Sequence, residues 1–103
     1  MTVISADNRF EWDSEKNEIN KVKHGLSFEE ILDVVDDSFF LERYDYLHSY
    51  ATEDRMIGIG AVNGVAVVTV AFTERQRISL ISARIASPTE EKVYYGYCKR
   101  LNS

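Results

Sequence analysis

Three short stretches of this sequence carry the residue types that could cleave a phosphodiester. They contribute Lys23 and His24, then His48, Glu53 and Arg55, then Arg77 and Arg84. Cleavage of RNA needs a base for the 2′-hydroxyl, an acid for the leaving oxygen and cations around the phosphorane, because the substrate supplies its own nucleophile. If the three stretches meet beside a sheet, they could do this chemistry without a metal ion.

Each of these side chains also has an ordinary structural explanation. His24 falls just before an expected helix end, where the helix dipole favours a positive charge. His48 lies in a polar stretch typical of an exposed loop. Glu53 and Arg55 could form a strand-edge ion pair worth less than about 1 kcal/mol. Arg84 could form a salt bridge with a C-terminal helix.

Arg77 and Arg84 are seven residues apart, so an undisturbed strand points them to opposite faces. A bend or a strand end is needed to bring both to one site. Two histidines without a cysteine pair are a poor ligand set for zinc, and we predict no metal and no cofactor. Ser49, Ser82 and Cys98 show no paired base, so covalent catalysis has no support.

The composition fits one folded domain over residues 1–103, but the charge is unusual for a nucleic-acid binder. The formal net charge is -5, with 17 acidic against 12 basic residues. Acidic residues crowd 29–37 and 42–54, whereas 16–24 and 75–84 are locally basic, so a local patch could hold phosphate. We see neither the roughly 20 apolar residues of a membrane helix nor a secretion signal, and expect a cytoplasmic protein.

The N-terminal part of the sequence predicts a short strand and a helix. Residues 10–12 alternate like a strand, and a helix with its N-cap at Asp13 or Ser14 is predicted to end at Gly25. Its two strong apolar residues are three apart and predict a narrow stripe that faces the core. They are Ile19 and Val22, and the side chains that share one side of the helix are Lys16, Asn20 and Lys23.

A second helix is predicted to begin at the capping box Ser27-Phe28-Glu29-Glu30. In such a box the Ser27 hydroxyl accepts from the Glu30 amide, and the Glu30 side chain reaches back. One face of this helix is apolar at helical spacing, at Phe28, Ile31, Leu32 and Val35. We therefore expect this face to pack on a sheet.

The rest of the sequence predicts a meander of strands and a C-terminal helix. Strand-like runs cover residues 39–47, 55–62, 65–72 and 77–83, and the nearly continuous apolar run 65–72 predicts a central strand. Asn63-Gly64 favours a type I′ hairpin turn, and Ser87-Pro88-Thr89-Glu90 is a capping box that opens a helix through Leu101. The predicted fold class is α+β, with N-terminal helices and a C-terminal helix packed on a small, mainly antiparallel sheet.

Short blocks spread over most of the chain stand in an order that is hard to obtain by accident. They are Phe10-Glu11-Trp12-Asp13, Lys16, Asn20, Lys23-His24-Gly25, Ser27-Phe28-Glu29-Glu30, His48-Ser49, Glu53-Asp54-Arg55, Ile57-Gly58, residues 65–70, Thr73-Glu74-Arg75, Arg77-Ile78, Ile81-Ser82-Ala83-Arg84 and Ala86. In this order and at these separations the blocks resemble the BrnT family, ribonuclease toxins of type II toxin–antitoxin systems.

The resemblance implies a compact fold similar to the RelE-like toxins, translation arrest by RNA cleavage and neutralisation by a BrnA antitoxin. That antitoxin would carry a ribbon-helix-helix domain, so operator DNA would be contacted through it and not through this chain. The implied active surface is Lys23, His24, Glu53, Arg55, Arg77 and Arg84. Lys23 and the arginines would hold the phosphate, and His24 or Glu53 would be the base.

Two departures from the family pattern reduce the positive charge near that surface. Ile85 follows Arg84 where another basic residue is expected, and the turn from Glu74 to Arg77 is short. A non-catalytic interaction module, whose apolar groove binds a partner helix, is therefore the alternative class. A metal-dependent hydrolase would require activity that a chelator removes, and the ligand set does not favour it.

Overall fold

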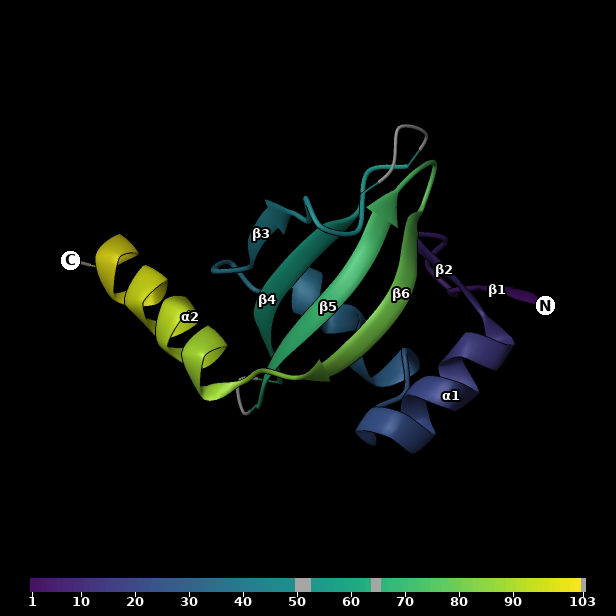
Figure 1. The fold of residues 1–103 in the computed structure, drawn as a ribbon, viewed down its shortest axis with the longest axis horizontal. Coiled ribbons are helices and arrows are strands. Elements are labelled where there is room, and N and C mark those ends of the chain that lie inside the picture. The colour runs from purple at the N-terminus through teal and green to yellow at the C-terminus, as the bar shows by residue number, and fades with distance from the viewer. Residues whose placement is uncertain (50–52, 64–65, 103) are drawn as a thin grey trace.

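The computed structural model describes residues 1–49, 53–63 and 66–102, which form a six-stranded sheet flanked by three helices (Figure 1). The strand order is β1-β2-β6-β5-β4-β3, and all pairs are antiparallel except β2 with β6. This confirms the predicted fold class. None of the described helices is long and apolar enough to cross a membrane. The elements are β1 (Thr2–Ile4), β2 (Phe10–Asp13), α1 (Ser14–His24), η1 (Glu29–Asp36), β3 (Leu41–Tyr44), β4 (Met56–Val62), β5 (Ala66–Glu74), β6 (Ile78–Ile85) and α2 (Pro88–Leu101).

The central strand β5 is flanked by β4 and β6, as the apolar run predicts. Its residues from Val67 to Val70 are buried in succession, so both faces of the strand are covered. Pairing of Val62 with Ala66 leaves three residues between β4 and β5. Asn63 has the positive φ of 57° that a hairpin turn needs, whereas Gly64 of the predicted Asn63-Gly64 turn lies outside the described residues.

The strand predicted over residues 39–47 is shorter in the structure, where β3 ends at Tyr44. Asp45 turns the chain because its carboxylate accepts from the Leu47 N–H at 3.2 Å. Its carbonyl also accepts from the His48 N–H at 3.4 Å. These local bonds compete with the strand ladder, which is why the alternating pattern overestimates the length of β3.

The predicted second helix is present as η1, but it is a 3-10 helix instead of the α-helix that the apolar spacing indicates. Its fully buried residues are Phe28, just before it, with Ile31 and Val34. They are three residues apart, as expected for a helix with three residues per turn. Leu32 and Val35, which an α-helix would place on the same face, are only partly buried.

The start of η1 is tied to α1 instead of being closed by the full capping box. Ser27 Oγ accepts from the Glu30 N–H at 3.2 Å, but the Glu30 carboxylate receives the Ser27 hydroxyl at 3.0 Å. The Phe28 N–H donates to Asn17 Oδ1 at 2.8 Å. Asn17 of α1 thus accepts from a backbone N–H at the start of η1 that a capping box does not satisfy.

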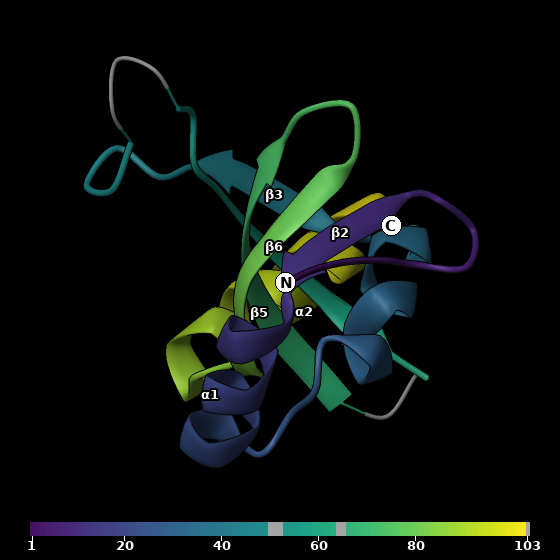
Figure 2. The ribbon, with the colours of Figure 1, turned by 90° about the vertical axis from the view of Figure 1, so that its right-hand side faces the viewer.

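Helix α1 lies beside β6 (Figure 2). Its ends are as predicted, but the side of the helix that faces the core is the opposite one. Ile19 and Val22, predicted to face the core, are 64% and 90% exposed, whereas Asn17 and Asn20 are buried. Asn20 Nδ2 donates to the Ala83 carbonyl at 2.8 Å, and Asn20 Oδ1 accepts from the Ala83 N–H at 3.0 Å. Strand β2 pairs only with the first residues of β6. The backbone N–H and C=O groups further along this edge of β6 therefore need hydrogen-bond partners, which an aliphatic side chain cannot provide.

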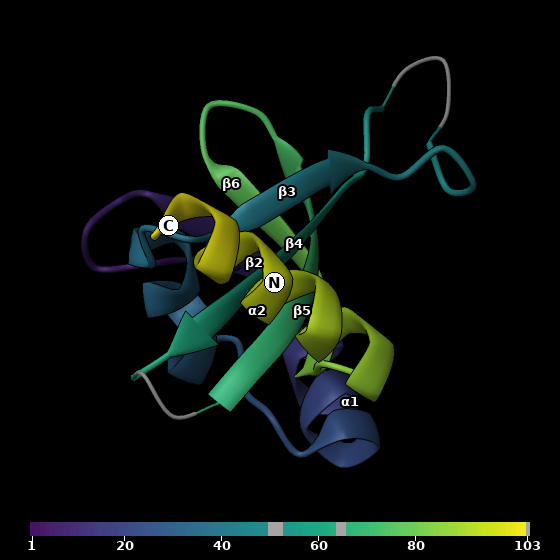
Figure 3. The ribbon, with the colours of Figure 1, turned by 90° about the vertical axis from the view of Figure 1, so that its left-hand side faces the viewer.

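Helix α2 begins as predicted and lies across β4 and β5 on the face away from η1 (Figure 3). Ser87 Oγ accepts from the Glu90 N–H at 3.2 Å, and the Glu90 carboxylate accepts from the Ser87 N–H at 2.8 Å. The Asp37 carboxylate accepts from the buried Tyr94 hydroxyl at 2.5 Å and from the Ala61 N–H at 2.8 Å. Burial raises the pKa of Asp37, but these hydrogen bonds outweigh burial and lower it.

Candidate active site

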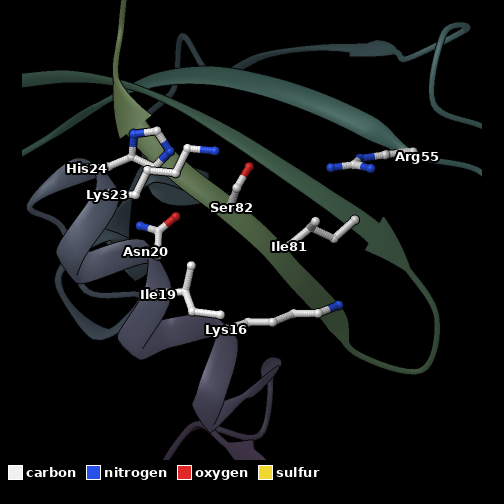
Figure 4. Close-up of a pocket in the computed structure, with 8 residues that line it drawn as sticks. All are labelled: Lys16, Ile19, Asn20, Lys23, His24, Arg55, Ile81 and Ser82. Atoms are coloured by element: carbon white, nitrogen blue, oxygen red, sulfur yellow. The ribbon is translucent and has the colours of Figure 1, made fainter.

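A groove of about 340 Å³ lies between α1 and β6 (Figure 4). It combines three lysine or arginine side chains with one histidine, and none of the described residues that line it carries a carboxylate. A site of this kind suits a phosphate group, since the charges of the anion and of the lining are opposite. The lining residues are Lys16, Ile19, Asn20, Lys23, His24, Arg55, Ile81 and Ser82.

The β6 side of the groove is shaped by a β-bulge. Ala71 pairs with Ser82 and Phe72 pairs with Leu80, so Ile81 is the extra residue in β6. Leu80 and Ala83 consequently both face the core, while Ile81 and Ser82 both line the groove. Bulges often redirect side chains beside functional sites. Ile81 and Ser82 could not be assigned to the site from the sequence, because a bulge leaves no signal in a strand-like run.

Lys23 and His24 reach the groove from the last turn of α1. Gly25 ends the helix with a φ of 73°, and its N–H donates to the Lys21 carbonyl at 2.9 Å. The hydrogen bonds between Asn20 and β6 set the distance of this turn from the strand. Lys16 lines the same groove, in agreement with its predicted place on one side of the helix with Asn20 and Lys23.

Arg55 stands opposite α1, and its guanidinium points into the groove (Figure 4). Its backbone is held at both polar atoms, because its carbonyl accepts from the Asp45 N–H at 2.7 Å and its N–H donates to Ser49 Oγ at 2.9 Å. The buried Arg55 Nε has no hydrogen-bond partner within the described part of the chain. A buried donor of this kind is costly unless a ligand or water accepts from it.

Glu53 lies next to this groove instead of in it. It lines an adjoining hollow of about 270 Å³ that shares Lys16 and Ile81 with the groove. Its carboxylate pairs with Arg75 at 3.4 Å, so the partner is not Arg55, which sequence analysis considered. To act on a phosphate in the groove, Glu53 must leave Arg75 or act across the boundary between the hollows.

Arg77 and Arg84 lie at opposite ends of β6 and already have partners. Arg77 precedes the strand and donates to Asn8 Oδ1 at 2.9 and 3.1 Å. Arg84 donates to both oxygens of Glu90 at 2.6 and 2.8 Å, the salt bridge to α2 that sequence analysis considered. This bidentate contact is the main reason that the pKa of Glu90 is lowered to about 2. The bulge interrupts the alternation of β6 between the two arginines, which nevertheless lie at opposite ends of the strand.

The six predicted site residues therefore divide into three groups. Lys23, His24 and Arg55 share the groove, Glu53 lies in the adjoining hollow, and Arg77 and Arg84 lie at the two ends of β6. His48 is exposed and its Nδ1 contacts Asp45 at 2.9 Å. In residues 1–49, 53–63 and 66–102, no three His, Cys, Asp or Glu side chains form a cluster that could hold a metal ion.

The acidic side chains of η1 lie on the other face of the sheet from the groove. Helix η1 packs on the core face, to which Leu80 and Ala83 point, and the groove lies on the opposite face with Ile81 and Ser82. The exposed acidic side chains of η1 are Glu29, Glu30, Asp33 and Asp36. The net charge of -5 is thus compatible with a groove whose described lining is cationic.

Fold and groove together define a small α+β domain with a groove whose described lining carries cations and no carboxylate. A family model described as the ribonuclease toxin BrnT of type II toxin-antitoxin systems matches residues 12–90, and the chain belongs to this family. The crystal structure of the Brucella abortus ribonuclease toxin BrnT is similar, with 34% sequence identity and a TM-score of 0.55. That match covers 74% of this chain and 92% of the Brucella chain. No curated protein matches this sequence.

Proposed function

We propose that this chain cleaves RNA in the groove between α1 and β6, by attack of the substrate's own 2′-hydroxyl and without a metal ion. One observation carries the proposal: Lys23 and His24 of α1 line one groove together with Arg55 from a distant segment, and the described lining residues include no carboxylate. Family membership makes RNA the expected substrate. The groove offers this substrate cations and an imidazole.

The side chains of the groove suit distinct steps of this reaction. Lys23 and Arg55 bind the scissile phosphate and stabilise the charge that grows on the phosphorane. Arg55 Nε, which has no hydrogen-bond partner among the described residues, is a donor that a phosphate oxygen could accept from. We assign the proton transfer to His24, because imidazole is the commonest proton-transfer group in enzymes and His24 lines the groove itself. Glu53 is the alternative base.

Arg77 and Arg84 fit a supporting role in this proposal. They lie at the two ends of the strand that borders the groove, so they suit phosphates on either side of the scissile one. Arg84 must exchange its two bonds with Glu90 for bonds to a phosphate. Since the guanidinium recognises carboxylate and phosphate with the same planar geometry, this exchange keeps its hydrogen bonding intact.

The proposal extends to the cellular role of the protein. Cleavage of RNA would arrest translation and growth. Because translated RNA is found in the cytoplasm, we expect the protein to act there. Membership of a type II family implies an antitoxin partner, which we propose to be of the BrnA type with a ribbon-helix-helix domain. Operator DNA would then be contacted only through that antitoxin.

Purified protein incubated with total bacterial RNA in excess EDTA tests the proposal. We expect cleavage to persist, and the variants Lys23→Ala and Arg55→Ala to slow it by about 10²-fold, because each removes a transition-state cation. Lys99→Ala is the matched control for Lys23→Ala, since both are exposed lysines in the last turn of a helix. It should leave the rate nearly unchanged.

Other results would contradict particular parts of the proposal. Loss of cleavage in EDTA that a divalent cation restores would refute metal independence. Full activity of both groove variants would refute the site. If RNA stayed intact in the presence of folded wild-type protein, the non-catalytic interaction module would be favoured. The hydrogen bonds from Arg84 to Glu90 support that alternative in part, because they occupy a cation of the predicted active surface.

A further inference from the structure

Helix α1 has an inverted distribution of polar and apolar side chains. Its buried residues are Asn17 and Asn20, whereas Ile19 and Val22 are 64% and 90% exposed. Single exposed aliphatic residues are ordinary. Here, however, the two strong apolar residues of the helix both lie in solvent and its buried positions are amides, which suggests that a partner covers the exposed side.

The exposed apolar residues adjoin the cationic groove. Ile19 lines the groove, and Val22 is three residues further along the same helix, where side chains are neighbours. Lys16 and Lys23 flank Ile19 at spacings of three and four residues, and both line the groove. We call Ile19, Val22 and these two lysines the α1 surface. It combines aliphatic side chains with the positive charges that line the groove, whereas the acidic neighbours Glu15 and Glu18 on α1 are not among the residues that line it.

We propose that the α1 surface binds the antitoxin, through a segment that carries aliphatic side chains next to carboxylates. The lysines offer charge complementarity to the carboxylates, and Ile19 and Val22 offer contact area to the aliphatic side chains. RNA could neutralise the lysines, but its sugar–phosphate backbone gives the two aliphatic residues little to pack against. A protein segment of this chemistry satisfies both parts of the surface.

This inference rests on the proposed function, because it places the antitoxin at the mouth of the groove in which RNA is cleaved. A segment seated on Ile19 and against Lys23 would occupy space that the substrate needs. Neutralisation would then follow from direct exclusion of RNA.

Helix α2 also exposes apolar residues, but it is the weaker candidate. The family match ends at Glu90, near the start of α2, whereas it includes all of α1. The hollow along α2 has charges of both signs, from Glu91, Lys92 and Lys99, and so gives no clear charge preference for a partner. The groove beside α1 has cations and no carboxylate among its described lining residues.

The test replaces Val22 with glutamate and measures binding of the purified product of the adjacent gene by calorimetry. Val22→Glu adds a charge that repels carboxylates and removes an apolar contact, so we expect at least about a tenfold loss of affinity. Val22→Gln removes the contact only and should have a smaller effect. Val93→Glu is the matched control, because Val93 is an exposed valine of α2, and it should bind like the wild type.

RNA cleavage by the same variants separates this inference from the proposed function. Val22 does not line the groove, so Val22→Glu should cleave RNA at the wild-type rate and resist neutralisation. Wild-type affinity of Val22→Glu, or no binding by the wild type, would overturn the inference. The inference would also be overturned if Val93→Glu alone lost antitoxin binding. It would be overturned as well if the wild type were a dimer that Val22→Glu dissociates, because the surface would then bind a second copy of this chain. One mixed result is informative: Val22→Glu binds the antitoxin more weakly, but antitoxin bound to the wild type does not slow RNA cleavage. This result would support the α1 surface as the antitoxin site and refute the groove as the site of cleavage.

Discussion

Replacing Asn20 with leucine tests whether α1 is held to β6 by hydrogen bonds. The Asn20 amide donates to the carbonyls of Ala83 and Leu26 at 2.8 and 2.9 Å and accepts from the Ala83 N–H at 3.0 Å. Leucine has a similar volume and can make none of these bonds. Each backbone group left without a partner costs about 1–3 kcal/mol, and apolar burial of leucine offsets part of the sum. We expect a net loss of about 3 kcal/mol.

Urea denaturation of Asn20→Leu beside Val22→Leu gives the measurement and its control. Both substitutions place leucine on α1, but Val22 is exposed, so its free energy of unfolding should change by less than about 0.5 kcal/mol. A loss below about 1 kcal/mol for Asn20→Leu would refute the reasoning, because apolar contact would then suffice to hold the helix. We also expect slower RNA cleavage, since Lys23 and His24 follow Asn20 by one turn.

Two further substitutions test other contacts. Glu90, whose pKa falls from 4.5 to about 2 beside Arg84, contributes stability that is complete above pH 4.5 and lost as the pH falls towards 2. Allowing for the 43% exposure of Arg84, this amounts to about 1–2 kcal/mol, so the melting temperatures of wild type and Glu90→Gln should differ at neutral pH and converge in acid. Gly58→Ala would put a Cβ 2.1 Å from the Phe40 ring and should cost about 2 kcal/mol in urea denaturation. Phe40→Leu in the same background should restore part of that loss, and no cost for Gly58→Ala would contradict the observed packing.

Elements whose ends are set by local chemistry could be predicted from the sequence. Gly25 ends α1 because glycine adopts its φ of 73° without steric cost, and Ser87 with Glu90 opens α2 through hydrogen bonds within four residues. The central position of β5 follows from an apolar run that only a strand covered on both faces can bury. These signals depend on neighbouring residues only.

Three features could not be read from local patterns, because distant segments determine them. The orientation of α1 depends on backbone groups of Ala83 that lie 63 residues from Asn20. The bulge at Ile81 depends on the register of β6 against β5. The same limit applies to the candidate site. The helical period indicates that Lys16 and Lys23 share a side, but Arg55 is brought opposite them by bonds to Asp45 and Ser49.

The net charge of the chain also does not reveal how the charged side chains are arranged in space. A formal charge of -5 would weigh against binding RNA if the charges were spread evenly. Charges farther apart than the Debye length, about 8 Å at physiological ionic strength, are largely screened from one another. The acidic side chains of η1 lie across the sheet from Lys23 and Arg55. A phosphate in the groove would therefore respond mainly to the cations that line it, because none of the described lining residues carries a carboxylate.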